Sequence, residues 1–217
     1  MKIKAGLISL LAALSFLSGQ CCIIDAGHGG EDGGAVAPDG TLESELNLSI
    51  SLKLDALMGL FGADTVLTRS SEVIDYPAGA QTVRERKNAD QVRRVELIAS
   101  RENAVLISIH QNNFGDSRPS GAQVLYNKHS GSAELAARAH HFLGMIDGQK
   151  MRSSAEISED IFLMRSAECP AILVECGFLS NGEDLSKLES DEYRTKLALA
   201  LCAAYINYIS CPEDTNG

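Results

Sequence analysis

Short apolar runs alternate along the chain with longer segments in which apolar residues recur every three or four positions. Helical spacing of apolar residues predicts helices at residues 43–60, 82–100, 133–143, 181–188 and 191–209, the last capped by Asp191. The short apolar runs predict strands at residues 21–25, 64–68, 104–110, 121–126, 161–164 and 171–175. Strands that alternate with helices indicate an α/β sandwich. We expect a single three-layer domain, with a mostly parallel central sheet of about six strands and helices on both faces.

The N-terminal segment has the composition of an export signal. Lys2 and Lys4 precede an apolar run at residues 5–17, which is shorter than the roughly 20 residues that span a membrane. Because the first strand already begins at Cys21, little room remains for a cleavage site. We expect residues 1–20 to be a signal peptide or an N-terminal anchor, with a buried N-terminal helix as the alternative.

This division predicts one domain over residues 21–211, a polar tail at 212–217, and a protein exported to the cell envelope or the exterior. Any membrane contact would then involve only the N-terminal segment. The formal net charge of −10 argues against a nucleic-acid partner, which requires a basic surface.

The six cysteines are not arranged as a zinc knuckle, because none form a Cys-x-x-Cys pair. Several lie in apolar runs, which predicts buried free thiols. For an exported protein, a disulfide between Cys202 and Cys211 is the alternative.

Three predicted strands end in a polar side chain. His28 follows the first strand and opens a loop with five glycines at residues 29–40, His110 ends the strand at 104–110, and Glu175 ends the strand at 171–175. Each residue alone has an ordinary structural explanation, and a lone histidine is more often a structural residue. If the strands are parallel neighbours, however, the three side chains converge at one edge of the sheet.

Glu43 extends this set. It opens the first helix, where the helix dipole favours a glutamate in any case. The glycine-rich loop that starts at His28 can nevertheless fold Glu43 back towards that histidine. Two histidines and one glutamate form a common catalytic zinc set with a fourth position for water, and a second carboxylate beside that water would act as general base.

Four ordered motifs carry a family resemblance. They read IDAGHGGEDGGA at residues 24–35, GTLESELNL at 40–48, ISIHQN at 107–112 and VECGFLSN at 174–181. Over about residues 22–181 the chain resembles the zinc-dependent N-acetylmuramoyl-L-alanine amidases. Further motifs at 39–43, 93–98 and 121–126 look most similar to the germination-associated, spore-cortex branch of that family.

The resemblance implies one Zn²⁺ ion bound by His28, Glu43 and His110, and it implies Glu175 as the catalytic glutamate. Such a site would hydrolyse the amide between the lactyl group of N-acetylmuramic acid and L-alanine in peptidoglycan. An activator or a lipoprotein is the expected protein partner. An inactive wall-binding or partner-binding module, and a zinc peptidase that acts on stem peptides, are the alternatives.

Three further residues have open roles. Arg94 matches an arginine commonly found in the family, but it has an equally good explanation as a helix-surface residue. Asn112 matches an asparagine after the second histidine, which either orients substrate or bonds to the loop backbone. Asp32 either bonds to the glycine-rich turn or holds the second ring nitrogen of a histidine.

Overall fold

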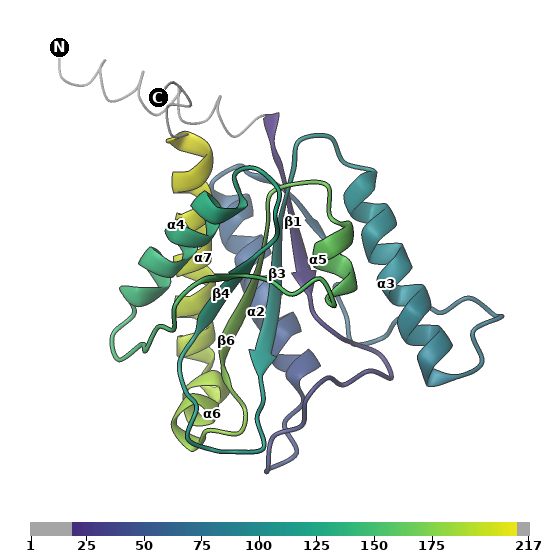
Figure 1. Ribbon diagram of the computed structural model, residues 1–217, viewed down its shortest axis with the longest axis horizontal. Helices are drawn as coiled ribbons and strands as arrows, with labels where there is room; N and C mark the ends of the chain where they lie inside the picture. The colour runs from purple at the N-terminus through teal and green to yellow at the C-terminus, as the bar shows by residue number, and fades with distance from the viewer. Residues whose placement is uncertain (1–18, 212–217) are drawn as a thin grey trace.

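The computed structural model describes residues 19–211 and contains one central sheet between two helical layers (Figure 1). The strands are β1 (Cys21–Ala26), β2 (Asp64–Leu67), β3 (Ala104–Asn112), β4 (Gln123–Tyr126), β5 (Ala155–Glu156) and β6 (Ala171–Phe178). The helices are α2 (Glu43–Leu60), α3 (Val83–Ala99), α4 (Ser132–Gly144), α5 (Phe162–Ser166), α6 (Gly182–Glu189) and α7 (Asp191–Ser210). The predicted fold class is therefore confirmed.

The sheet has the strand order β2-β1-β3-β6-β4-β5. Only the β4–β6 pair is antiparallel, and the other neighbouring pairs run parallel. Strands β1, β3 and β6 lie side by side at the centre, so their carboxyl ends meet at the same edge. This is the edge at which open α/β sheets bind their ligands.

Alternate residues of the central strands pack into two separate apolar clusters. Ile24 of β1 and Ile107 of β3 belong to the larger cluster, with residues of α2, α4 and α7. Their neighbours Ile23 and Leu106 belong to the smaller cluster, with Ile98 of α3 and residues of α5. Because successive strand residues point to opposite faces, these near-continuous apolar strands bury both faces of the sheet.

The predicted strand at residues 161–164 is wrong. This segment leads into the short helix α5, whose Leu163 and Met164 pack in the smaller cluster. A run of four apolar residues cannot by its pattern alone be distinguished from a buried helical turn. The remaining strand of the sheet is β5, a two-residue strand that pairs with β4 and that the apolar pattern did not predict.

Two smaller expectations also need correction. Ser190, not Asp191, caps α7, because its side chain accepts a hydrogen bond from the backbone of Tyr193. Cys202 is a buried free thiol and Cys211 an exposed one, so they form no disulfide. Cys211 lies nine positions after Cys202 along α7, a helical rise of roughly 13 Å, which is too far for a disulfide.

The sequence predicts a signal peptide or anchor at residues 1–20 and a polar tail at residues 212–217. Residues 1–18 and 212–217 lie outside the described residues, so both assignments stay predictions. Within residues 19–211, no helix is both long enough and apolar enough to cross a membrane.

Candidate metal site and catalytic centre

The site lies where β1, β3 and β6 end. The pairing register places His110 of β3 directly beside Glu175 of β6. His28 follows β1 by two residues, and Glu43 is the first residue of α2. The structure therefore brings together all four residues that the sequence singled out at element ends.

Two glycines allow this close approach. A Cβ atom on Gly27 would lie 2.3 Å from Nε2 of His110. Gly34 adopts a φ of +71°, and a Cβ atom there would lie 2.6 Å from Oε2 of Glu43 and 2.8 Å from the ring of His28. A side chain at either position would therefore displace the His110 ring, or the His28 ring and the Glu43 carboxylate. The glycines are thus required where the loop folds Glu43 back towards His28.

His28, Glu43 and His110 offer ligand atoms that all lie within 4.8 Å of one another. Nε2 of His28 lies 3.4 Å from Oε2 of Glu43, and Nδ1 of His110 lies 2.9 Å from Oε1. Two ligands of a tetrahedral zinc ion, each about 2.1 Å from it, lie roughly 3.4 Å apart. The donor types and their spacing therefore fit a zinc ion.

The hydrogen bonds that link His28, Glu43 and His110 change the protonation of His28 and Glu43. Burial disfavours a charged His28, but its hydrogen bonds to Asp32 and Glu43 outweigh burial and raise its pKa to about 9. Burial likewise disfavours a charged Glu43, but the hydrogen bonds to His110 and His28 lower its pKa. Glu43 is thus ionised at neutral pH, as a metal ligand must be.

Glu175 differs from Glu43 in its environment. Its Oε2 atom is buried and has no hydrogen-bond partner among the described residues. Burial, assisted by the nearby charge of Glu43, raises the pKa of Glu175 to about 7, with His110 and His28 opposing the shift. A carboxyl group with a pKa near neutrality is suited to accept and return a proton. The two glutamates therefore have environments that suit different tasks.

Arg94 is not a surface residue. Its side chain is 1% exposed, and it donates hydrogen bonds to the Asp25 carboxylate and to the backbone oxygens of Ala26 and His28 at 2.6–2.7 Å. Asp90, one helical turn before Arg94, accepts a further hydrogen bond from it. Arg94 thus fixes the backbone on which His28 is carried.

Asp32 and Asn112, the two other residues with open roles, make different contacts. Oδ2 of Asp32 lies 2.9 Å from Nδ1 of His28, so Asp32 contacts the second nitrogen of that histidine. Asn112 ends β3, and its backbone oxygen accepts a hydrogen bond from Leu179. Within residues 19–211 the Asn112 side chain makes no hydrogen bond to the site, so its role stays a prediction.

Asn47 is a site residue that the sequence analysis did not identify. Its side-chain amide donates hydrogen bonds to Oε1 of Glu43 and to the backbone oxygen of Gly27. Asn47 lies four positions after Glu43, so both side chains occupy one face of α2. The four-residue spacing from Glu43 was therefore the one feature of the sequence that could have placed Asn47 in the site.

Ser108 of β3 was also not identified. It interrupts an otherwise apolar strand, and its hydroxyl donates to the buried carboxylate of Asp25 at 2.6 Å. Asp25 also pairs with Arg94. Ser108 therefore helps to hold the carboxylate that binds Arg94 beneath the loop.

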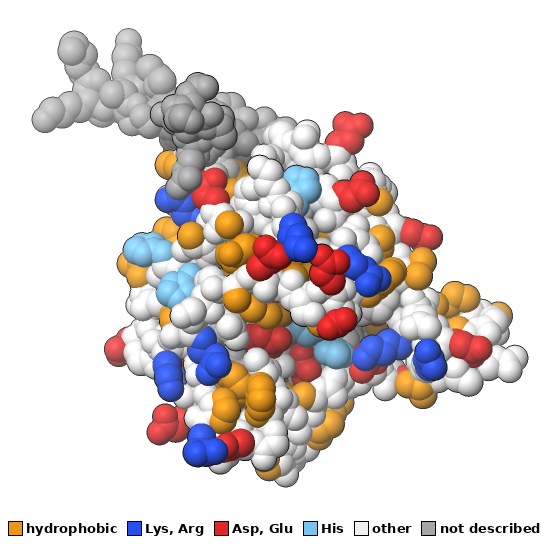
Figure 2. Space-filling model, in the orientation of Figure 1, with side chains coloured by type: hydrophobic (Ala, Val, Ile, Leu, Met, Phe, Trp, Pro, Cys, Tyr) orange, Lys and Arg blue, Asp and Glu red, His pale blue; other side chains and the backbone are white. Residues whose placement is uncertain are grey.

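The site opens into a cleft of about 380 Å³. Lys87, Asn88 and Gln91 of α3 line one wall, and residues 160–163 at the start of α5 line another. Figure 2 shows histidine and acidic side chains meeting in a hollow of the molecular surface.

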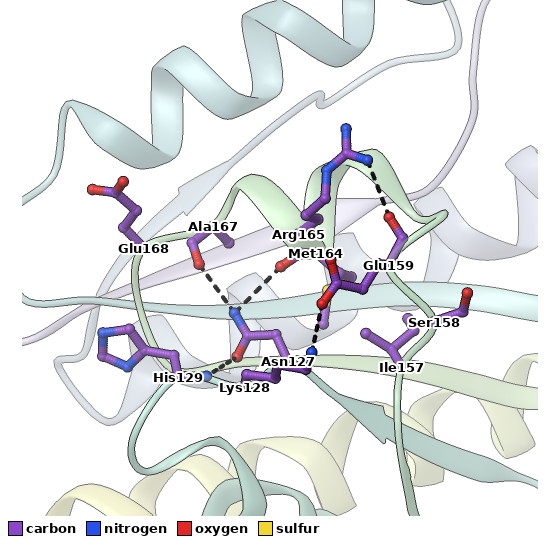
Figure 3. Close-up of a pocket in the computed structure, with 10 residues that line it drawn as sticks. All are labelled: Asn127, Lys128, His129, Ile157, Ser158, Glu159, Met164, Arg165, Ala167 and Glu168. Carbon is purple, nitrogen blue, oxygen red and sulfur yellow. Dashed lines mark hydrogen bonds and ion pairs between the residues drawn. The ribbon is translucent and has the colours of Figure 1, made fainter.

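A second pocket of about 320 Å³ lies beyond α5 (Figure 3). The Asn127 amide points into the protein and donates to the backbone oxygens of Met164 and Ala167, while Lys128 pairs with Glu159. These polar groups bond to one another. Among residues 19–211, only His28, Glu43 and His110 form a cluster of potential metal ligands.

Residues 22–207 match the family model described as N-acetylmuramoyl-L-alanine amidase. The chain belongs to this amidase family. The amidase is 32% identical over 195 residues to the germination-specific N-acetylmuramoyl-L-alanine amidase of Bacillus subtilis, covering 89% of this chain and 81% of that one.

Solved structures show the same relationship. The CwlD amidase of Clostridioides difficile, whose structure is a complex with the GerS lipoprotein, has a TM-score of 0.83 and 34% identity, over 88% of this chain and 98% of that one. The catalytic domain of CwlV from Bacillus (Paenibacillus) polymyxa has a TM-score of 0.76 and 25% identity, over 88% and 98%.

These relationships confirm the family, the fold and the enzyme class that the sequence motifs predicted. The amidase hydrolyses peptidoglycan at the N-acetylmuramoyl-L-alanine bond. The family is metal-dependent, and this chain has a His-Glu-His group that can bind a metal.

Proposed function

We propose that the amidase uses one zinc ion, bound by His28, Glu43 and His110, and that Glu175 is the general base. The observation that carries this proposal is the placement of Glu175 beside His110, with an unpaired buried oxygen next to a compact group of zinc-type donors. The bond cleaved is the amide between the lactyl group of N-acetylmuramic acid and L-alanine.

The chain supplies binding and proton transfer. A bound zinc ion lowers the pKa of a coordinated water towards about 7 and polarises a carbonyl oxygen. Glu175 accepts the proton of the attacking water on a carboxylate oxygen and returns it to the leaving alanine nitrogen. In the metal-free protein, burial raises the pKa of Glu175 to about 7, so this carboxyl group holds a proton more readily than an exposed glutamate does.

Digestion of purified muropeptides tests this function directly. We expect the zinc-loaded amidase to release an intact stem peptide that begins with L-alanine, together with a sugar product that retains its lactyl group, as read by mass spectrometry. A metal chelator should abolish the release, and added zinc should restore it.

Other outcomes would contradict the proposal in different ways. Cleavage between two amino acids of the stem would identify a zinc peptidase. Binding to sacculi without cleavage would identify a wall-binding module. Release of the stem peptide that persists after complete metal removal would exclude the metal site as the catalytic centre.

The biological setting of the amidase is also a proposal. We propose that it acts in the cell envelope of spore-forming bacteria during germination, after export through residues 1–20, and that it binds a lipoprotein. Its similarity to a germination-specific amidase and to CwlD, whose structure is a complex with a lipoprotein, supports this setting. Fusing residues 1–20 to a secretion reporter tests the export step, because a reporter that stays inside the cell would contradict it.

A further inference from the structure

One face of α3 contacts the loop that carries His28. Lys87 and Arg94 are seven residues apart, which is about two helical turns, so they lie on the same face of α3. Arg94 donates to the backbone oxygen of His28, and Nζ of Lys87 lies 2.8 Å from Oδ2 of Asp32. A third α3 residue, Arg86, pairs with Glu31 of the same loop. Of these α3 residues, the sequence analysis singled out only Arg94.

Asp32 links Lys87 to the ring of His28. The same oxygen that pairs with Lys87 lies 2.9 Å from Nδ1 of His28, while its other oxygen accepts a hydrogen bond from the backbone of Gly34. When Nδ1 of His28 donates its hydrogen to Asp32, Nε2 retains the lone pair that faces Glu43. In the neutral ring, the contact with Asp32 therefore favours the tautomer that binds a metal through Nε2.

His28 needs this support because of its backbone. Its φ of +60° is uncommon for a residue with a side chain. The His28 side chain is 21% exposed, and its ring lies edge-on to the His110 ring with the ring centroids 5.0 Å apart. Arg94 fixes the backbone of His28, and Asp32 fixes its ring.

We propose that Lys87 is a positioning residue for the metal site, which acts by holding Asp32 against His28. The inference rests on the proposed function, because it takes His28 as a zinc ligand. Lys87 touches neither His28 nor Glu43 in this scheme, and its effect passes entirely through Asp32. This dependence gives the proposal its test.

Zinc dissociation constants of the full chain, measured by competition with a chelating dye, provide a readout that is independent of activity. Partners of metal-bound histidines usually change metal affinity by about 10- to 100-fold, so Asp32→Asn should weaken binding by that factor. The Lys87–Asp32 pair is partly exposed, so Lys87→Gln should weaken binding by only about two- to fivefold. Lys87→Arg, which can still pair with Asp32, should restore most of the affinity.

The double variant decides whether Lys87 acts through Asp32. In an Asp32→Asn background, Lys87→Gln should produce little further loss, because the contact it supports is already changed. Lys53→Gln is the matched control, since Lys53 makes a similar pair with Asp191 at 2.9 Å on α7. That variant should bind zinc like the unaltered chain. Thermal unfolding of the metal-free variants establishes that each one folds.

Two results would overturn the inference. One is unchanged zinc affinity in Lys87→Gln, and the other is an equal loss with and without the Asp32 substitution. His28→Ala separates these failures from a failure of the proposed function. If His28→Ala binds zinc as tightly as the unaltered chain, the proposed ligand set itself is wrong. If only His28→Ala loses zinc, the ligand set stands and the role of Lys87 does not.

Discussion

The two faces of the sheet are built from different interactions. On one face, α2 buries Leu46, Ile50, Leu54 and Met58 against the sheet, together with the apolar surfaces of α4 and α7. On the other face, the buried residues of α3 are Asp90, Arg94 and a single apolar residue, Ile98. The first face is a large apolar core, whereas the second combines a smaller apolar cluster with the ion pairs and hydrogen bonds of α3.

This difference separates stability from positioning. Apolar burial is favourable but not directional, so the α2 face can hold the fold together without specifying the orientation of a catalytic side chain. Hydrogen bonds from Arg94 and Lys87 are directional, and they end on the loop that carries His28. We therefore expect substitutions of the apolar residues of α2 to change mainly stability, and substitutions of the ion-paired residues of α3 to change the site as well.

The largest effect is expected where the two faces meet, at the end of β6. Glu175→Gln removes the proposed general base but keeps the shape of the side chain, so the turnover number should fall by about 10²- to 10⁴-fold. Muropeptide digestion measures the rate, and circular dichroism should show an unchanged fold. Turnover within threefold of the unaltered enzyme would remove Glu175 from this role.

The next largest effect is expected from Arg94→Met on the α3 face. This change leaves Asp25 buried without its ion-pair partner, which typically costs about 3–5 kcal/mol. The backbone at His28 also loses its donor, so the folded fraction should show weaker zinc binding. Chemical denaturation and zinc titration of the same samples measure both effects. Lowered stability with zinc affinity intact would restrict Arg94 to a structural role.

Leu54→Ala on the α2 face provides the opposite case. Leu54 is fully buried, so its truncation should lower the free energy of unfolding by about 2–5 kcal/mol. Zinc affinity and turnover per folded molecule should stay close to those of the unaltered chain. A loss of zinc affinity similar to that of Arg94→Met would show that the two faces are not separate in function.

A smaller effect concerns pH and the metal-free protein. Burial raises the pKa of Glu175 to about 7, so its charged form is disfavoured in the folded state. The unaltered chain should therefore lose stability relative to Glu175→Gln as pH rises from about 4.5 to about 7, by up to about 3 kcal/mol. Denaturation of both proteins across this range measures the difference. A difference that does not change with pH would contradict the burial of this carboxyl.

The sequence predicted the α2 face more completely than the α3 face. The spacing of Leu46, Ile50 and Leu54 predicted α2 with its exact bounds, because apolar periodicity reports directly on burial. The helix of Arg94 was also predicted, but the sequence alone explained Arg94 equally well as a residue on the helix surface. Charge patterns do not show which cation has a buried partner, since Asp25 lies 69 residues away in sequence.

The candidate site was predicted for a related reason. His28, His110 and Glu175 each end an apolar strand, and that pattern can be recognised without a structure. The contacts of Lys87 with Asp32 and of Asn47 with Gly27 depend instead on how the glycine-rich loop folds, which local patterns do not specify. The prediction of a strand at residues 161–164 was wrong because four apolar residues fit either a strand or a helical turn, and this segment forms α5.

The most direct test of the central claim compares the two glutamates in one experiment. Glu43→Gln and Glu175→Gln should both abolish release of the stem peptide from muropeptides, but for different reasons. Zinc competition measurements on the same preparations should show that Glu43→Gln loses most of its zinc affinity, whereas Glu175→Gln binds zinc like the unaltered chain. Undiminished zinc affinity in Glu43→Gln, or stem-peptide release by Glu175→Gln at the unaltered rate, would contradict this account.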